Sequence, residues 1–496
     1  MEKVESLQTS STALIAEGST RLTGYAGKNY LKLLTLLVLV LVVYTIATLN
    51  KRSIEVTFAG WFSILAALVP ITLWVRGIVP GLPVFPLFCM CYMITYGLQF
   101  LLNTENKLGV MSPSDIWGAS FTFSVFVLAG TVAWAAILKF PKRVPEAVRV
   151  FTPGKGDRLL LYSLAASDLF LICANARWVP LSEGAFAIVR AFITGLSALG
   201  IFVIAFRAGA GQVSQKVKTA FVLLLILYVV SSAVNFFLVG AISALLMTSI
   251  GYALGKNAVP WGLLGVMLVS SSILHFGKFE MRIKYWPEGS QGFQVFPWDY
   301  PAIYVEWFSA SMVAMTSKES KETASIYERS SLLDMLLMVR DLTPSRFPYL
   351  DGETYRLLPQ VFMPRFLNSA KISTHEADTI LNVYYEKQTR EGTSSTTFGW
   401  GLLNESYANY GMVGVGIVGA IVGLMYGYMT RVSLFQPLLS YPTLISLTAI
   451  SYAIQTESVS TYLVAALFQS LVAVTITSFV FMKKVSYKTA MEWQKL

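Results

Sequence analysis

Charged residues are scarce in this sequence, and their scarcity excludes an ordinary soluble protein. Of 496 residues, 13% are Asp, Glu, Lys or Arg and 55% are hydrophobic, and the mean hydropathy is +0.59. Soluble globular domains carry about 25% charged residues. We therefore expect a polytopic membrane protein, whose length sets the number of membrane spans rather than the number of soluble domains.

Cysteine and histidine are also rare. The three cysteines, Cys89, Cys91 and Cys173, all lie in apolar segments, so the polar part of the chain has neither a disulfide framework nor a Cys-based zinc site. With His275 and His375 as the only histidines, we do not expect a multi-histidine metal site either. We expect no metal and no cofactor.

Several soluble-enzyme motifs are missing. The sequence has no Walker loop, no dinucleotide fingerprint, no DxD-like nucleotide-sugar motif and no HExxH. These absences disfavour chemistry on soluble nucleotides. They favour a substrate that is already attached to a membrane lipid.

Long apolar segments dominate what is present. A segment of about 20 apolar residues crosses the ~30 Å hydrocarbon core of a bilayer. By this rule we expect an all-α polytopic membrane protein of about twelve transmembrane helices, with one large extracytoplasmic loop between helices nine and ten. The predicted ranges are 31–49, 57–75, 82–102, 116–138, 159–176, 185–206, 219–236, 238–254, 259–275, 400–429, 436–454 and 459–482.

The net charge of +10 is concentrated in the short connections between these ranges. With the N-terminus inside, 20 Lys and Arg side chains face the cytoplasm and five face outward. The positive-inside rule then places both termini in the cytoplasm and the large loop outside, and a nucleic-acid partner is not expected. The resulting organisation is a cytoplasmic tail (1–30), a nine-helix bundle (31–275), the loop (276–398), three helices (399–482) and a second cytoplasmic tail (483–496).

The loop is polar but contains ordered elements. Residues 297–315 are aromatic and apolar enough to lie at the membrane interface. Residues 321–341 show the periodicity of an amphipathic helix. The segment that follows combines arginines, suited to phosphate oxygens, with aromatic rings, suited to sugars. These residues are Arg340, Arg346, Arg356, Arg365, Phe347, Tyr349, Tyr355, Phe362 and Phe366.

Polar residues within the spans gather near the side of the loop. Asp168 and Arg190 are placed near the outer ends of their helices, either as a functional pair or as a structural ion pair. The tenth predicted span has glycines every two to four residues, which predicts close helix packing. At its start, Glu405 and Asn409 are four residues apart and share a helix face, which makes this polar helix entrance a candidate acceptor-sugar site.

Three segments resemble the Wzy-type polysaccharide polymerases, which polymerise O-antigen and exopolysaccharide repeat units in bacteria. They are PYLDGETY (Pro348–Tyr355), MPRFLNSAK (Met363–Lys371) and NESYANYGMVGVGIVG, which leads into the glycine-rich span. The resemblance implies an enzyme of the bacterial inner membrane. This enzyme would transfer a glycan from undecaprenyl pyrophosphate to another lipid-linked repeat unit at the outer face, with a flippase and a chain-length regulator as partners.

The resemblance also suggests roles for individual residues. Arg365 and Arg356 would stabilise the charge that develops on the leaving pyrophosphate. Glu405, Asp351 or His375 would accept the proton of the acceptor hydroxyl, and His375 is the most suitable because histidine titrates near neutral pH. The residues expected to bind substrate are Arg190, Arg329, Arg340, Tyr355, Asn409 and Lys371.

Two other functions remain open at this stage. One is a ligase, like the O-antigen ligases, that moves finished glycan to a different acceptor. The other is a flippase or transporter for lipid-linked oligosaccharide. A transporter should show charges deep in several spans together with repeat symmetry. This sequence has its charges on the outer side and a nine plus three arrangement, which favours an enzyme.

Overall fold

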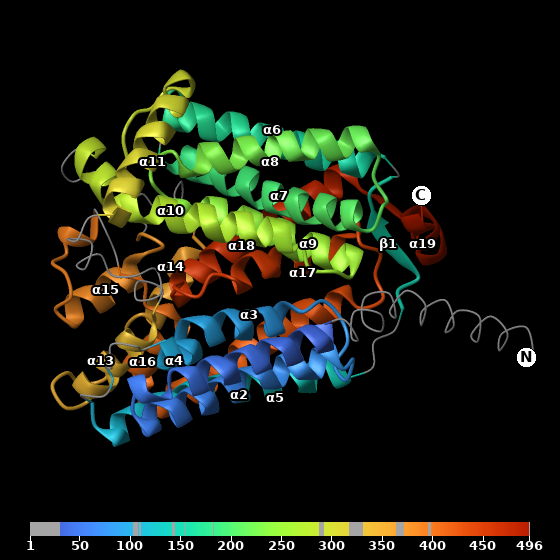
Figure 1. Ribbon diagram of the computed structural model, residues 1–496. Coiled ribbons are helices and arrows are strands. Elements are labelled where there is room, and N and C mark those ends of the chain that lie inside the picture. Colours follow the sequence, from blue (N-terminus) through green and yellow to red (C-terminus); the bar gives the residue numbers. More distant parts are fainter. Residues whose placement is uncertain are drawn as a thin grey trace, which may run out of the picture.

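The structure is a computed structural model of a long helical bundle. Most helices run side by side, the elements of the polar loop gather at one end, and β1, β2 and α19 lie at the other end (Figure 1). The structure describes residues 30–102, 108, 111–140, 144–152, 154–181, 183–286, 292–316, 331–363, 372–394 and 398–495.

Ten helices in these residues are long and apolar enough to cross a membrane. The prediction of a helical polytopic membrane protein is therefore confirmed. The ten helices are Tyr30–Ala47, α2 (Ile54–Val75), Val84–Leu102, α5 (Pro113–Lys139), the segment Phe192–Gly209 of α7 (Glu183–Gly209), α8 (Gln215–Ala233), α9 (Leu238–Lys256), α10 (Trp261–Tyr285), α16 (Gly401–Ser433) and α18 (Ser460–Phe481). The third of them, Val84–Leu102, consists of α3 (Val84–Tyr92), a π-helical turn (Met93–Gly97) and α4 (Leu98–Leu102).

The remaining two predicted spans also coincide with helices, α6 (Lys155–Asn175) and α17 (Tyr441–Ala453). Neither is among the helices that meet the span criteria in the described chain, and α17 has only 13 residues. The count of twelve spans therefore stays a prediction.

The glycine-rich α16 packs against α5, as the glycine pattern predicted. A Cβ atom on Gly423 would lie 2.0 Å from the carbonyl oxygen of Gly130, and one on Gly419 would lie 2.3 Å from that of Phe126. Only glycine allows the two backbones to come this close. The backbones of α5 and α16 are therefore in direct contact at this interface.

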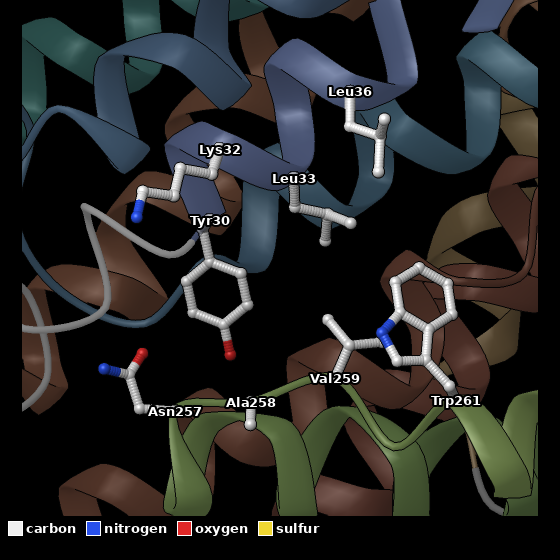
Figure 2. A pocket seen from close by; sticks show the side chains of 8 residues that line it. All are labelled: Tyr30, Lys32, Leu33, Leu36, Asn257, Ala258, Val259 and Trp261. Atoms are coloured by element: carbon white, nitrogen blue, oxygen red, sulfur yellow. The ribbon is translucent and has the colours of Figure 1, made fainter.

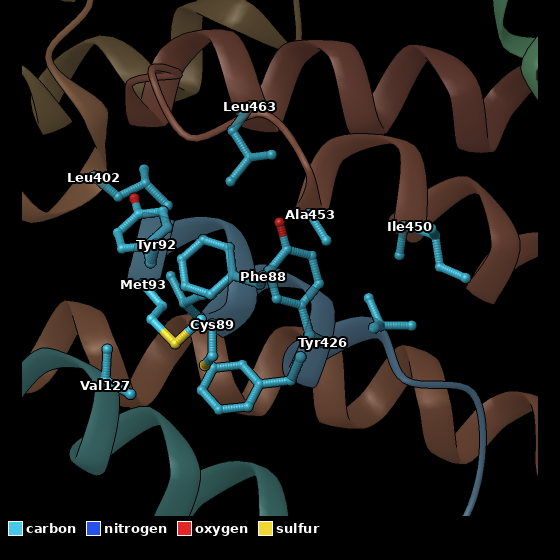
Figure 3. Close-up of a cluster of buried hydrophobic side chains, with 14 of the residues drawn as sticks. Phe88, Cys89, Tyr92, Met93, Val127, Leu402, Tyr426, Ile450, Ala453 and Leu463 are labelled. Carbon is cyan, nitrogen blue, oxygen red and sulfur yellow. The ribbon is translucent and has the colours of Figure 1, made fainter. Parts of the chain in front are cut away.

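An aromatic core fills the space beside this interface. Phe88 and Tyr92 extend from α3, where the ring of Tyr92 stacks on Phe126 of α5 with centroids 5.7 Å apart. The ring of Phe88 lies 5.5 Å from that of Tyr426 of α16. Figure 3 shows Phe88, Tyr92 and Tyr426 in this core together with Ile450 of α17, so the core joins α3 to the last helices of the chain.

A short β-ribbon connects distant parts of the chain at the end opposite the loop. β1 (Ala147–Val150) pairs antiparallel with β2 (Lys483–Ser486), and α19 (Tyr487–Lys495) follows directly. Since the two strands touch, the chain must cross the membrane an even number of times between them. The twelve-span prediction meets this condition with eight crossings in that interval. The sequence analysis predicted a cytoplasmic tail over 483–496 and did not predict the ribbon.

The segment predicted as the large loop is partly helical. α10 continues to Tyr285, so the residues after 275 extend a helix. α11 (Tyr300–Thr316, after the short 3-10 turn Pro297–Asp299) crosses α10 closely at Gly277, and an apolar face of α11 remains exposed. The other elements are α13 (Leu333–Leu342), η6 (Tyr355–Leu357), α14 (Leu358–Val361), α15 (Glu376–Tyr384) and η7 (Gly392–Ser394).

The predicted amphipathic helix over 321–341 is visible only in its second half. α13 buries Leu333, Leu336 and Leu337 and exposes Asp334, as the periodicity predicted. Residues 321–330 lie outside the described part of the chain. In the described part, α13, η6, α14 and α15 form a layer over the ends of α5, α16 and α18, while α11 packs on α10.

Cysteine labelling in intact cells tests the predicted orientation of this layer. Lys387 in the loop and Ser486 in β2 are both exposed, and Cys89 is buried. We expect a membrane-impermeant maleimide to label Lys387→Cys in intact cells and Ser486→Cys only after the membrane is opened. The unsubstituted chain gives the background from Cys91 and Cys173. Labelling of both variants in intact cells would contradict the orientation.

Candidate functional site

α16 is interrupted near its start, where the sequence predicted one continuous span. Tyr410 (φ −142°, ψ 18°) and Gly411 (φ 57°, ψ −145°) have non-helical backbone angles. Glycine takes such a positive φ without the steric penalty that other residues meet. Residues 401–409 therefore form a separate helical segment, which is buried under the loop layer.

The loop segment 348–355 docks at this interruption. The backbone N–H of Leu350 donates to the carbonyl of Ala408 (3.1 Å), and that of Asp351 donates to the carbonyl of Asn409 (3.2 Å). The last carbonyls of a helix have no partners within the helix, so the break supplies acceptors for the loop. Two of the segments that carry the family resemblance are thus in direct contact.

Two tyrosine–glycine contacts complete the docking. A Cβ atom on Gly352 would lie 2.0 Å from the hydroxyl oxygen of Tyr410, and one on Gly411 would lie 2.8 Å from that of Tyr349. Each tyrosine comes from one segment and each glycine from the other. Both glycines have a positive φ as well, 85° and 57°. The two segments therefore fit only with glycine at both positions.

Asn409 and Glu405 lie beneath the docked segment and are fully buried. The Nδ2 atom of Asn409 donates to Thr354 Oγ1 (2.9 Å) and to the backbone carbonyl of Glu405 (2.8 Å). The Glu405 carboxylate accepts from the backbone N–H and the hydroxyl of Ser460, each at 2.7 Å. Both carboxylate oxygens are thus engaged. Because Ser460 is the first residue of α18, the Glu405 carboxyl group lies at the N-terminus of that helix, where the helix dipole favours its charged form.

The next two residues of α18 hold the start of α15. The Thr461 hydroxyl donates to the backbone carbonyl of Thr374 (2.9 Å), and the ring of Tyr462 lies 5.0 Å from the imidazole of His375. Arg190 of α7 is exposed and lies close enough to Tyr462 to interact with it electrostatically. His375 and Arg190 therefore both approach Tyr462.

His375 forms a pair with Asp378, three residues later. The Nδ1 atom of His375 lies 3.4 Å from Oδ2 of Asp378; the His375 side chain is 53% exposed and that of Asp378 is 8% exposed. Burial raises the pKa of the Asp378 carboxyl, and His375 lowers it again in part. This arrangement, an accessible imidazole beside a buried carboxyl, is that of a histidine oriented for proton transfer.

Arg356 and Tyr355 follow the docked segment on its outer side. Arg356 is exposed, and its guanidinium is 3.5 Å from the backbone carbonyl of Asp351. The ring of Tyr355 stacks on Tyr410, with centroids 6.2 Å apart, and Tyr410 is 47% exposed. Burial raises the pKa of the Tyr355 hydroxyl well above its ordinary value, so this group stays neutral. An accessible cation thus lies beside an aromatic pair.

Arg340 lies elsewhere, on another side of α16. Its guanidinium donates to Thr122 Oγ1 (2.7 Å), lies 5.3 Å from the centre of the Tyr407 ring and rests against Gly118. Tyr407 follows Glu405 by two residues and so points away from it. Arg340 therefore ties α13 to α5 and α16, apart from Arg356 and His375.

Several predicted residues lie outside the described part of the chain, namely Arg329, Arg365 and Lys371. The prediction that Asp168 and Arg190 form a structural ion pair is wrong. Asp168 is buried in α6, without a hydrogen-bond partner for either carboxylate oxygen among the described residues, and Arg190 is exposed on α7.

Comparison with known proteins gives no support for a family. No family model, curated protein or solved structure matches the chain. The site is therefore interpreted from its residues and geometry alone.

No group of three or more metal-ligating side chains occurs within the described ranges. A cavity of about 300 Å³ lies between the first helix and the turn from α9 to α10. Figure 2 shows Tyr30 and Lys32 on one side of this cavity and Trp261 on the other. It lies at the ribbon end of the bundle, away from α15 and the first turn of α18 (Figure 1), and is not part of the candidate site.

The sequence analysis missed four residues of this site: Thr354, Asp378, Ser460 and Tyr462. Asp378 could have been found, because His375 and Asp378 are three apart at the start of a helical pattern and so share a face. Ser460 carries the signal of a residue that opens a helix. Nothing in the local sequence pairs it with Glu405, which is 55 residues away.

Replacing Gly411 tests the docking. Gly411→Ala should lower the free energy of unfolding by about 1–3 kcal/mol, because φ 57° with ψ −145° is essentially restricted to glycine. Gly416→Ala is the matched control, since its nearest neighbouring atom would be 3.9 Å away. Thermal unfolding of the purified protein measures the difference. Equal melting temperatures for the two variants would refute the proposed strain.

Replacing Glu405 separates a structural role from a catalytic one. In Glu405→Gln, the amide oxygen can accept from the Ser460 N–H while the amide nitrogen donates to the Ser460 hydroxyl, so stability and activity should persist. Glu405→Ala leaves a buried N–H without an acceptor, which costs about 1–3 kcal/mol. In thermal unfolding, the melting temperature of Glu405→Gln should therefore be close to that of the native chain, and that of Glu405→Ala should be well below it. Glu353→Ala, which replaces an exposed glutamate, is the control. If Gln keeps stability but abolishes activity, Glu405 is the base.

Proposed function

We propose that this protein polymerises lipid-linked oligosaccharide repeat units at the outer face of a bacterial cell membrane. The donor is a glycan on undecaprenyl pyrophosphate, and the acceptor is a hydroxyl of a second lipid-linked unit. The observation that carries the proposal is the docking of segment 348–355 onto the interrupted start of α16. These are two of the three segments that resemble the polysaccharide polymerases, and they form one structural unit.

The reaction needs a cation for its leaving group. As the bond between the anomeric carbon and the pyrophosphate oxygen breaks, negative charge develops on the pyrophosphate, and a positioned guanidinium stabilises it. Arg356 suits this role because it is exposed and, among the described residues, makes one long hydrogen-bond contact, to the backbone carbonyl of Asp351. Arg190, exposed near Tyr462, is a second cation for the same anion. The assignment of Arg365 rests on the resemblance alone.

The reaction also needs a base, and His375 fits it better than Glu405. The acceptor hydroxyl loses its proton as its oxygen attacks the anomeric carbon. The Glu405 carboxylate is buried, with both oxygens bonded to Ser460. The His375 imidazole is accessible, and Asp378 can hold the proton on Nδ1 so that the other ring nitrogen accepts. Asp378 is then a positioning residue.

The aromatic pair of Tyr355 and Tyr410 suits the sugar itself. Tyr410 is partly exposed beside Arg356, and flat rings pack on the apolar faces of sugars. Arg340 is not assigned to substrate here, because its guanidinium is engaged by Thr122 and Tyr407.

Deleting the protein and restoring variants tests the proposal. Loss of long surface glycans with retention of single repeats supports a polymerase. Arg356→Ala should reduce chain formation by about 10²–10³-fold, the usual effect of removing one transition-state hydrogen-bond donor. His375→Gln should reduce it by about 10²–10⁴-fold, the contribution of a general base. Glycan length on gels is the measurement, and Asp378→Asn should impair the same step without loss of protein.

Matched controls are available in the chain. Arg346→Ala removes a loop arginine that is paired with Glu386 at 2.5 Å, and His275→Gln removes the only other histidine. Both should leave the glycan unchanged. Accumulation of precursor on the cytoplasmic side would indicate a flippase. Full-length polymer that is not joined to its final acceptor would indicate a ligase. Native glycan from both Arg356→Ala and His375→Gln would refute the residue assignments.

A further inference from the structure

The ribbon at the end opposite the loop contains two like charges in direct opposition. Arg149 of β1 faces Lys484 of β2 in the antiparallel register. Cβ atoms of directly opposed residues are about 4.5–5.5 Å apart, and like charges at that distance destabilise the pairing. The alternate face of the ribbon carries Val148 and Val150, which pack on α19. The valine face therefore packs on α19 and carries Lys483 opposite Val150 at its end, while the other face carries the Arg149–Lys484 pair.

Within the residues described, no carboxylate forms an ion pair with Arg149 or Lys484. The contact that Arg149 does make is with a ring: its guanidinium lies 4.3 Å from the centre of Phe479. The like-charge pair thus lacks the anion that would make its geometry favourable.

The position of the pair indicates which anion it meets. α18 ends at Phe481 and β2 begins at Lys483, so the ribbon directly follows a membrane helix. Phe479 lies in the last turn of that helix and is 65% exposed, as a lipid-facing residue would be. Because the Arg149 guanidinium rests on this ring, it lies where hydrocarbon meets the lipid headgroups.

We propose that Arg149 and Lys484 form a binding site for the headgroup phosphate of an anionic phospholipid. The planar guanidinium can bind two phosphate oxygens, and the ammonium can bind a third from the opposite strand. The acyl chains of the lipid would lie along the exposed face of α18 at Phe479. A free phosphate ion has no acyl chains and cannot make this contact. The site does not depend on the proposed function.

This site makes the ribbon sensitive to lipid. A bound phosphate between the strands converts a repulsive cross-strand pair into two attractive contacts. Since β1 lies between α5 and α6 and β2 follows α18, the lipid would stabilise the junction between the segment after α5 and the segment after α18. Anionic lipid should therefore raise the melting temperature of the whole protein.

The experiment uses the full chain in detergent, with dioleoyl-phosphatidylglycerol as the probe and native mass spectrometry as the readout of bound lipid. Arg149→Gln with Lys484→Gln should weaken binding by about 25-fold, from about fivefold for each charge removed near a membrane surface. Lys216→Gln, an exposed lysine at the start of α8, is the matched control and should change binding less than twofold.

Two further measurements make the result decisive. In lipid-free detergent, the double variant should melt at the same temperature as the native chain or above it, because a repulsion has been removed. Phosphatidylglycerol should raise the melting temperature of the native chain and not that of the variant. The proposal is overturned if the variant binds the lipid as well as the native chain does, or if Lys216→Gln weakens binding equally. It is also overturned if inorganic phosphate displaces the lipid, which would indicate a soluble anion as the ligand.

Discussion

The interruption of α16 is the constraint on which the outer part of this protein depends. A broken helix leaves backbone carbonyls that need donors, and inside a membrane protein such a break persists only where protein covers it. Here the cover is the segment that carries Leu350 and Asp351, whose N–H groups reach the last two carbonyls before the break. The loop is therefore not an independent domain. Its fold is determined by the helix end beneath it.

Buried and accessible polar groups have different roles in this arrangement. Glu405 and Asn409 connect α16 to α18 and to the docked loop, and they are closed off from solvent. His375 and Arg356 are held by short elements anchored to that framework, and they remain accessible. Burying a carboxylate is tolerable only when its oxygens accept hydrogen bonds, and Ser460 supplies both. A framework of this kind can hold the accessible groups in place without taking part in chemistry itself.

Much of the fold was predictable because the bilayer imposes a simple rule. A span needs an apolar segment of fixed length, and each predicted range coincides with a helix. The close packing of α16 was readable from its glycines. The break at Tyr410 was not, because Gly411 is one of many glycines in that helix and only its partner, Tyr349, distinguishes it.

The candidate site was predictable in part because polar residues stand out in an apolar chain. Glu405 and Asn409 were predicted as site residues because they are polar and lie at the start of a span, and both lie beneath the docked loop segment. Their roles depend on contacts with Ser460 and Thr354, which are distant in sequence and give no local signal. His375 and Asp378, three residues apart, form the one pair that could have been read directly.

The ribbon has a consequence for assembly. Its strands are four residues each, too short to form alone, and they come from the two halves of the chain. Closing so long a loop carries a large entropic penalty unless intervening structure has already brought the ends together. The ribbon can therefore form only after α18 has been inserted. Its closure marks the completion of the bundle, when the segment that follows α5 pairs with the segment that follows α18.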